Sequence, residues 1–532
     1  MRLFIAGPPG IGKSTVGREL ARILGAAFVD MDERIERRTR RPNARVIVEE
    51  GIGRFRQLEV ELLDMLAPTP AWEVVATGGG AVITPANRAR MRSLGVIVGL
   101  RGSLATVTRG LERTMSKRGH LVVEGIAPRD HAARVLRERR GAYRDADVIF
   151  DVDGATPEET ARAIAAWIVS ARGIRIDVAA SRPYPILVRA GLLEHVGQHL
   201  ADLGWAGRVA LVHDATAARL HLAAVRGSLE TAGMEPVTIR VPEGERAKTA
   251  AALERLWRDL ARAGIGRDGG VVALGGGATG DLAGLAAATY ARGIALAHVP
   301  TTLLAMVDSS IGGKAAIDLP EGKNLVGAFH APSAVLADPA VLATLPARQI
   351  SSGLAEVIKT AYLADGDSVE QTARGVERVL ECDLGPLTLM VAMSAEMKAA
   401  VVSADEREAG LREILNFGHT FGHAYEAARG YTVTHGEAVA IGMVFATALA
   451  ELLGLSPASL RPRMEGILDR AGLPVRSRIP ARAWSLLARD KKARAGNVRW
   501  ILPRRIGRFS EVTGVGSRDL ERAARIVEGR AA

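Results

Sequence analysis

The chain has 532 residues, about three times the length of a typical domain, which predicts two or three separate hydrophobic cores. With 48% hydrophobic residues, 24% charged residues and 58 glycines, its composition excludes a disordered or fibrous protein and favours a soluble α/β fold. A net charge of +11 would suit small anionic substrates or nucleic acid, and the single cysteine, Cys382, excludes a disulfide framework.

The N-terminal stretch MRLFIAGPPG has only a short apolar run and no small-residue cleavage site, so it does not resemble a signal peptide. The longest apolar stretch, residues 438–450, is too short to cross a bilayer, which requires about 20 residues. We therefore expect a cytoplasmic protein with no membrane partner.

Residues 1–172 show the pattern of one α/β unit. The strand RLFIAG leads through a glycine-rich loop into the helix KSTVGRELARILG, and FVDMDERI, EVVATGGG and GVIVGL continue the alternation. Alternating strands and helices of this kind predict a parallel sheet. An apolar helix at residues 159–171 closes the unit, so we place the end of the first domain at residue 172.

The loop GPPGIGKST, residues 7–15, fits the phosphate-binding pattern GxxxxGK[ST] between a strand and a helix. In such a loop the backbone N–H groups bind phosphate, the lysine reaches the β- and γ-phosphates, and the hydroxyl residue ligates Mg²⁺. A purely structural glycine loop is the alternative. The motif predicts ATP with Mg²⁺, bound by Gly10, Ile11, Gly12, Lys13, Ser14 and Thr15.

Asp30 and Asp32 follow a predicted strand whose end lies near this loop. Asp30 could bind Mg²⁺ through water, while Asp32 accepts the proton of the attacking hydroxyl group. The alternative is that one aspartate caps the following helix and the other is simply solvated.

The first unit resembles shikimate kinase over essentially its whole length. GRFRQLE places Arg56 and Glu59 at the spacing of that family's acceptor-binding pair. In ERRGAY, Arg139 matches another substrate-binding arginine of the family. In shikimate kinases a lid segment that closes over the ATP site usually reads Arg-Pro-Leu-Leu, but here it is RGHLV. Arg118 is therefore retained for the ATP site, whereas Gly119 loosens the loop. The resemblance implies phosphorylation of shikimate with catalysis by Lys13 and Asp32. The shikimate-binding residues that it implies are Asp32, Arg56, Gly78, Gly79, Gly80 and Arg139.

After residue 172 the stretch RGIRIDVAASRPYPILV starts a new strand pattern. Residues 173–340 form a second α/β pattern, whereas alanine- and leucine-rich helical periodicity dominates residues 341–532. VVALGGGATGDL contains GxGxxG between a strand and a helix, but no acidic residue follows at the spacing that binds a ribose. A dinucleotide is therefore only one possible ligand for this loop.

His419 and His423 lie four residues apart in LNFGHTFGHAYE, which we predict to be helical. Both rings would then project from one face, as two ligands of a shared metal ion would. The spacing alone does not decide whether both histidines bind a metal.

The second unit resembles 3-dehydroquinate synthase from about residue 175 to residue 505. The match is almost word for word in YARGIALAHVPTTLLAMVDSSIGGKAAIDLPEGKNLVGAF, GLAEVIKTAY, DEREAGLREILNFGHTFGHAYE and THGEAVAIGM. It implies NAD, one divalent metal ion (zinc or cobalt), and conversion of 3-deoxy-arabino-heptulosonate 7-phosphate into 3-dehydroquinate with loss of phosphate. NAD would be reduced and reoxidised within each turnover. Arg292 matches an arginine that reaches the neighbouring subunit's phosphate, which implies a homodimer.

The same resemblance assigns individual residues. Glu356, His419 and His435 would hold the metal and leave room for substrate oxygens, as a catalytic zinc requires. The implied substrate-binding residues are Asp308, Lys314, Lys323, Asn324, Lys359, Lys398, Arg412, Asn416, His423 and Arg292, of which Lys314, Lys359, Lys398, Arg412, Asn416 and His423 would be catalytic. The implied NAD contacts are Asp214, Glu245, Lys248, Gly276, Gly277, Asp281, Thr301, Thr302, Lys314 and Lys323, and either Lys491 or Lys492 would reach the substrate.

Lysine is rare in this chain, with nine lysines among the 70 basic residues. Eight of the nine lie in the motifs described above, and the exception, Lys117, lies in the kinase lid. A random scatter over solvated helix faces would not give this distribution. Compact ammonium groups gathered in this way suit a substrate with a carboxylate and a phosphate.

We therefore predict a bifunctional α/β enzyme of the shikimate pathway: a P-loop kinase, then a synthase with an NAD-binding half and a helical metal-binding half. The nearest alternative is a related sugar-phosphate cyclase that makes a cyclitol, paired with a kinase for that product. Arg412 and Lys398, like Arg56 and Arg139, favour acidic substrates instead.

A basic, nucleotide-dependent nucleic-acid binder is an alternative from another class. It would need a nucleic-acid-binding motif or an aromatic platform for stacking, and only 4% of the residues are aromatic. We therefore expect small-molecule substrates, namely shikimate, ATP and the heptulosonate phosphate, and no nucleic-acid partner.

Overall fold

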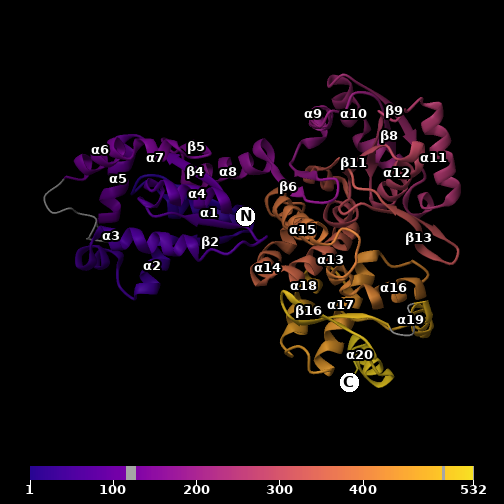
Figure 1. Ribbon diagram of the computed structural model, residues 1–532. Helices are drawn as coiled ribbons and strands as arrows, with labels where there is room; N and C mark the ends of the chain where they lie inside the picture. Colours follow the sequence, from indigo (N-terminus) through magenta and orange to yellow (C-terminus); the bar gives the residue numbers. More distant parts are fainter. Residues whose placement is uncertain (116–126, 494–497, 531–532) are drawn as a thin grey trace. The chain divides into compact units, whose positions relative to one another are not determined.

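The computed structural model describes residues 1–115, 127–493 and 498–530 of the chain. Arg118 and Gly119 of the predicted lid lie outside the described residues, as do the side chains of Lys491 and Lys492. The chain divides into two compact units, Met1–Ile168 and Val169–Ala532 (Figure 1). The proposed division of the second unit at residue 340 stays a prediction.

The first unit is built on a five-stranded parallel sheet in the order β2-β3-β1-β4-β5. The central strand β1 is buried along its whole length, and Phe4 contributes to a core with residues of α2 and α3 such as Ile35 and Leu62. A parallel sheet covered by helices explains why its strands are continuous apolar runs. The elements are β1 (Arg2–Ala6), α1 (Lys13–Leu24), β2 (Ala27–Asp30), α2 (Met31–Thr39), α3 (Asn43–Asp64), β3 (Glu73–Ala76), α4 (Pro85–Leu94), β4 (Gly95–Arg101), α5 (Leu104–Met115), α6 (Pro128–Glu138), α7 (Arg140–Arg144), β5 (Val148–Asp151) and α8 (Pro157–Ala166).

The second unit begins with a seven-stranded sheet in the order β6-β7-β14-β11-β10-β8-β9. Its strands are parallel except β6, which pairs antiparallel with β7. The segments RVALVH, VTIR and ALAHVP lie in β8, β9 and β11, as the α/β pattern of this part of the sequence predicts. The elements are β6 (Ile174–Val178), β7 (Tyr184–Val188), α9 (Val196–Asp202), β8 (Gly207–His213), α10 (Ala215–Thr231), β9 (Met234–Arg240), α11 (Ala250–Arg262), β10 (Gly270–Gly275), α12 (Gly277–Thr289), β11 (Ala295–Pro300), β12 (Lys314–Leu319), β13 (Gly322–Phe329) and β14 (Ala334–Ala337).

The rest of the second unit is mainly helical, drawn in orange to yellow in Figure 1. It also contains an antiparallel hairpin, β15–β16, which the helical periodicity of these residues did not indicate. Its tryptophan, Trp500, is buried and stacks against Phe445 of α17. The elements are α13 (Ala347–Ala364), α14 (Gly366–Leu380), α15 (Leu384–Ala404), α16 (His419–Ala428), α17 (His435–Leu452), α18 (Leu460–Arg470), α19 (Ala481–Ala493), β15 (Trp500–Arg505), β16 (Arg508–Val512) and α20 (Ser517–Val527).

Two helices of this part, α15 and α17, are long and apolar enough to cross a membrane by length and composition alone. In each, however, more than 70% of the apolar window is buried within the structure. Core helices of globular domains have the same composition.

The stretch LNFGHTFGHAYE is not one continuous helix. Leu415 and Asn416 end a 3₁₀ helix, Gly418 has a left-handed conformation with φ of 78°, and α16 begins only at His419. A Cβ at Gly418 would lie 2.7 Å from Met443 of α17, so glycine is required for both the backbone angle and the close packing. His419 and His423 still lie one helical turn apart within α16.

Candidate active sites

The phosphate loop of the first unit joins β1 to α1. Gly10 and Gly12 have φ of 79° and 96°, a region that glycine enters without strain. Gly12 is the N-cap of α1, so the loop ends at the N-terminus of this helix. This is the arrangement of an anion-binding loop.

Lys13 is buried at the first position of α1, where its Nζ donates hydrogen bonds to the carbonyls of Gly7, at 3.0 Å, and Pro8, at 3.1 Å. Burial lowers the pKa of Lys13 to about 8, although Asp32 and Asp30 partly offset this effect. The ammonium group of Lys13 therefore lies against the phosphate loop, where it could contact a bound phosphate.

Asp30 fits both interpretations of the FVDMDE motif. Its Oδ1 accepts hydrogen bonds from the backbone N–H groups of Asp32 and Glu33, so it caps α2. Its Oδ2 accepts a hydrogen bond from Ser14 Oγ at 2.6 Å, which places it beside the residue predicted to ligate Mg²⁺. Asp32 is half-buried and approaches Gly78 rather than being an isolated solvated acid.

Arg56 and Glu59 lie on α3 and form an ion pair of 2.6 Å. Glu59 is fully buried, which raises its pKa even though Arg56 opposes that shift. The glycines after β3 make room for this pair. A Cβ at Gly78 would lie 2.3 Å from Glu59 Oε1, and one at Gly80 would lie 1.9 Å from Arg56 Nη2.

Arg139 also reaches this glycine loop, because its Nη1 donates to the Gly79 carbonyl at 3.1 Å. Tyr143 Oη donates to the same carbonyl at 2.7 Å. The structure therefore brings the predicted shikimate-binding residues together around residues 78–80. Sequence reasoning missed Tyr143, although its position four residues after Arg139 indicates a shared helical face.

In the second unit, the GxGxxG loop joins β10 to α12. Gly276 caps α12, and a Cβ on it would lie 3.2 Å from Thr302, so the two predicted NAD contacts are neighbours. Asp214 caps α10 and accepts a hydrogen bond from Thr279 of α12 at 3.1 Å. Thr301 donates its backbone N–H to the Gly275 carbonyl at 2.9 Å.

A second group of predicted NAD contacts surrounds Lys248. This buried lysine pairs with Asp281 Oδ2 at 2.6 Å and donates to Asn324, which has a left-handed φ of 56°. Burial raises the pKa of Asp281 to about 6, although Lys248 opposes the shift. Glu245 lies 3.8 Å from Lys323, a longer ion pair.

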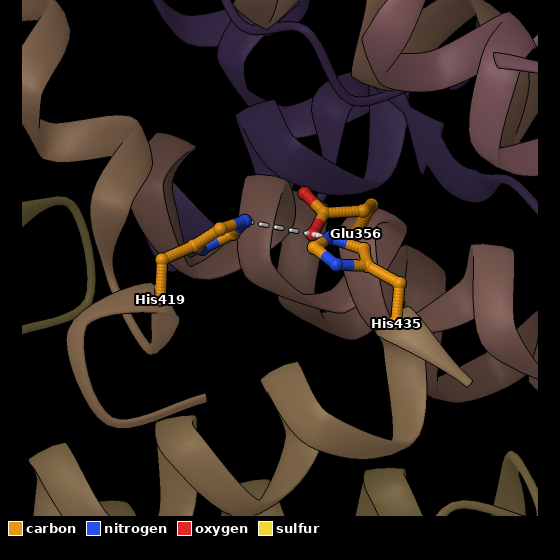
Figure 2. A group of neighbouring side chains, drawn as sticks. All are labelled: Glu356, His419 and His435. Atoms are coloured by element: carbon orange, nitrogen blue, oxygen red, sulfur yellow. Dashed lines mark ion pairs between the residues drawn. The ribbon is translucent and has the colours of Figure 1, made fainter. Parts of the chain in front are cut away.

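Three residues from three helices converge in the helical part: Glu356 of α13, His419 of α16 and His435 of α17. Figure 2 shows their side chains pointing toward one another. Each histidine Nε2 lies 3.4 Å from Glu356 Oε1, and possible ligand atoms of all three lie within 4.8 Å of one another. The pKa of Glu356 lies well below its ordinary value, because Lys359 and the imidazoles outweigh the effect of burial.

Local sequence explains this convergence. Thr434 and Glu437 form a capping box that fixes the start of α17, and His435 is its first residue. Gly436 then allows close contact with α13, since a Cβ there would lie 2.1 Å from the Ser352 carbonyl oxygen. Ser352 lies one helical turn before Glu356 on α13, so the close approach brings His435 to Glu356.

The donor set fits a divalent metal. Glu356 is buried, yet neither of its carboxylate oxygens accepts a hydrogen bond of normal geometry within the described residues. One carboxylate and two imidazoles form a typical catalytic zinc set with a free coordination position. His423 is exposed, and its ring centre lies 5.1 Å from that of His419 and 6.0 Å from that of His435. Among the described residues, the group of possible ligand atoms contains His419 but not His423, which favours the prediction that one histidine of the pair binds the metal.

The predicted substrate cations lie around this cluster. Lys359 pairs with Glu356, and Lys398 donates to the backbone carbonyl of Asp308 at 2.6 Å and to its carboxylate. Arg412 is buried and donates to the carbonyl of Gly312 at 3.1 Å. Burial lowers the pKa of Arg412.

One acidic residue joins two other predicted substrate contacts and was missed by sequence reasoning. Glu408 pairs with Lys314 at 2.5 Å and accepts from Asn416 at 3.4 Å. It has a left-handed φ of 59°, unusual for a residue other than glycine. The DEREAG stretch offered no signal for this arrangement beyond its charge.

Comparison with known proteins identifies both units. Family models described as the N-terminal and C-terminal parts of 3-dehydroquinate synthase match residues 238–352 and 353–493, and a shikimate kinase model matches residues 9–169. The 3-dehydroquinate synthase of Pelobacter propionicus is 48% identical over 327 residues, which cover 61% of this chain and 91% of that protein. The chain belongs to the 3-dehydroquinate synthase family. Its N-terminal unit adds a shikimate kinase, so the chain is a bifunctional enzyme of the shikimate pathway.

Solved structures of other cyclases are similar to this synthase. A 2-deoxy-scyllo-inosose synthase, solved with carbaglucose-6-phosphate, NAD⁺ and Co²⁺, is 28% identical with a TM-score of 0.61 and covers 66% of this chain and 100% of its own. A 2-epi-5-epi-valiolone synthase from Streptomyces hygroscopicus subsp. jinggangensis, solved with NAD⁺ and Zn²⁺, is 30% identical with a TM-score of 0.61. It covers 65% of this chain and 97% of its own.

Proposed function

We propose that the second unit converts 3-deoxy-arabino-heptulosonate 7-phosphate into 3-dehydroquinate, and that the first unit transfers the γ-phosphate of ATP to shikimate. The observation that carries the synthase proposal is the cluster of Glu356, His419 and His435 with cationic side chains beside it. A single metal site with buried cations around it suits a substrate that carries two anionic groups.

Glu356, His419 and His435 would hold the metal, either zinc or cobalt, and the residues around Gly276 and Lys248 would hold NAD. The two similar cyclases were solved with NAD⁺ and one of these metals, which supports this assignment. When bound, the metal polarises substrate oxygens and NAD accepts and returns a hydride. His423 is exposed at the edge of the cluster, in a position to exchange a proton with substrate.

The choice of an acidic substrate rests on two buried cations. Lys398 and Arg412 both lie in the helical part. Lys398 pairs with Asp308, whereas the guanidinium group of Arg412 donates to the backbone carbonyls of Glu406 and Gly312. A carboxylate on the substrate would complete this pairing. A sugar phosphate that lacks a carboxylate would leave Arg412 without an anionic partner, which is why we favour the heptulosonate phosphate over a cyclitol precursor.

In the kinase, Lys13 would bind the β- and γ-phosphates, and Ser14 with Asp30 would hold Mg²⁺. The hydrogen bond from Ser14 to Asp30 supports this pairing, because Mg²⁺ bound to the serine would lie beside the carboxylate. Asp32 would accept the proton of the shikimate hydroxyl, while Arg56 and Arg139 bind the shikimate carboxylate.

Arg292 supports a homodimer. It is exposed, and it follows Ala291 in a pair of consecutive left-handed residues with φ of 50° and 69°. Such strain is retained where a side chain must be held in one direction. We propose that Arg292 reaches the phosphate site of a second copy, and that the enzyme works as a cytoplasmic homodimer.

The test is phosphate release from the heptulosonate phosphate by the purified full chain. We expect release only with NAD and a divalent metal, and we expect His435→Ala to abolish it while leaving shikimate phosphorylation intact. His423→Ala should retain the metal and lose turnover. If His423→Ala rather than His435→Ala strips the metal, the assigned ligand set is wrong. A sugar phosphate without a carboxylate should not be turned over, and efficient turnover would favour the cyclitol alternative.

A further inference from the structure

Glu426 is a buried acid on α16 that none of the roles above includes. Only 6% of the residue is exposed, and it follows His419 by seven residues, or about two helical turns, so both lie on one face of the helix. Its two carboxylate oxygens have different partners. Oε1 accepts a hydrogen bond from Lys323 Nζ at 3.0 Å, and Oε2 lies 3.8 Å from His435 Nδ1.

The contact with His435 involves the ring nitrogen that faces away from the metal cluster. His435 Nε2 lies on the side of Glu356, at 3.4 Å, so its Nδ1 is the nitrogen available to an outer partner. His419 has the equivalent arrangement, with Nδ1 at 3.1 Å from the Phe417 carbonyl oxygen. A metal-binding histidine typically donates its second N–H to a carboxylate or carbonyl, which fixes the tautomer and the ring orientation.

The contact with Lys323 connects two parts of the second unit. Lys323 lies on β13, 103 residues before Glu426, and is one of the residues assigned to both NAD and substrate. Its ammonium group also lies 4.3 Å from the ring centre of Tyr431, and its other acidic neighbour, Glu245, is more distant at 3.8 Å. Glu426 is therefore the nearer of the two acids that hold this ammonium group.

We infer that Glu426 is a positioning residue, which orients the metal ligand His435 with one oxygen and anchors Lys323 with the other. The inference rests on the proposed metal set. One oxygen accepts a hydrogen bond from Lys323, and the other lies 3.8 Å from His435 Nδ1, so each oxygen of the carboxylate faces a different nitrogen. A glutamine would present an N–H₂ group to one donor, so it could satisfy either Lys323 or His435 but not both.

The experiment compares Glu426→Gln, Glu426→Asp and Glu451→Gln in the full chain. Glu451 lies on α17, the helix that begins with His435, but at its other end, where its carboxylate pairs with Arg461 at 3.0 Å, which makes it a matched control. Zinc affinity is measured on metal-stripped protein by competition with a fluorescent zinc indicator. We expect Glu426→Gln to bind zinc about 10- to 100-fold more weakly, the usual effect of losing such an outer partner. Glu451→Gln should bind zinc as the wild type does.

Two further readouts separate positioning from a structural role. Glu426→Gln should lower kcat and raise the KM for the heptulosonate phosphate at saturating zinc, while thermal unfolding of the metal-free protein stays close to that of the wild type. Glu426→Asp, which keeps both oxygens, should recover part of the zinc affinity, and it serves as the test if the glutamine variant does not fold. Unchanged zinc affinity in folded Glu426→Gln, or an equal loss in Glu451→Gln, would overturn the inference.

His435→Ala, measured in the same zinc assay, tests the metal set separately from the role of Glu426. If this variant loses zinc and Glu426→Gln does not, the metal set stands and the positioning role of Glu426 fails. If His435→Ala retains zinc, the proposed metal set itself is wrong.

Discussion

Replacing Gly80 of the kinase unit with alanine should weaken shikimate binding without unfolding the protein. A Cβ at this position would lie 1.9 to 2.0 Å from three atoms of the Arg56 guanidinium group, far inside van der Waals contact. The backbone of Gly80 has a negative φ of −118°, so alanine brings no backbone strain. The side chain of Arg56 would therefore have to move, breaking its 2.6 Å pair with the buried Glu59.

The displaced Arg56 would also lose its proposed hydrogen bond to the shikimate carboxylate. A charge-assisted hydrogen bond contributes about 1.5 to 3 kcal/mol, so its loss corresponds to a rise of about 10- to 150-fold in the KM for shikimate. The KM for ATP should stay within about twofold, because the phosphate loop does not depend on Arg56. A coupled assay of ADP formation at varied shikimate measures both constants. Gly53→Ala is the control, since Gly53 lies one turn before Arg56 on α3 and an added Cβ meets no atom within 4 Å. A folded Gly80→Ala protein with an unchanged KM for shikimate would refute this account of the glycine loop.

Three other predictions concern separate parts of the chain. Lys13→Ala should abolish ATP-dependent phosphorylation of shikimate and spare the synthase, and loss of both activities would show that the units are coupled. Arg292→Ala and Lys398→Ala should each be inactive as synthases, but refolding an equal mixture should restore about a quarter of wild-type activity. Random pairing makes about half of the dimers mixed, and one of the two sites in each mixed dimer is intact. No recovery would argue against a site shared between subunits. Burial lowers the pKa of His298 to about 4 from 6.5, so the ring stays neutral in the folded protein. As the pH falls from 6.5 toward 4, the unfolded chain takes up a proton that the folded protein does not, and the free energy of unfolding decreases. Urea unfolding should show a loss of about 2 kcal/mol between pH 7 and pH 5 that His298→Gln removes, and an equal loss in this variant would contradict the assignment.

The sequence was most informative where one short motif holds all the chemistry. The phosphate loop is such a case, because its glycines, Lys13 and Ser14 are adjacent in the chain and their geometry follows from the strand and helix on either side. The parallel sheets were likewise predictable from alternating strands and helices. The lid residue Arg118 lies outside the described residues, so its role in ATP binding stays a prediction.

The sequence was less informative where function depends on contacts between distant segments. Local periodicity would have allowed both His419 and His423 as metal ligands, and only the packing of α17 against α13 shows which of them faces Glu356. Glu426 shares the helix with these histidines, but its partner Lys323 lies 103 residues earlier, a pairing that no spacing rule predicts. The roles of the individual site residues therefore stay predictions that require the variants described above.

Each unit should hold its own active site for an acidic substrate, so one purified preparation should carry out both reactions. The experiment assays phosphate release from 3-deoxy-arabino-heptulosonate 7-phosphate and ATP-dependent phosphorylation of shikimate, before and after removal of the divalent metal from the synthase. We predict that both reactions occur, that metal removal stops the first while the second continues with added Mg²⁺, and that zinc restores the first. A preparation that phosphorylates shikimate but does not release phosphate from the heptulosonate phosphate under any metal and NAD conditions would contradict the account.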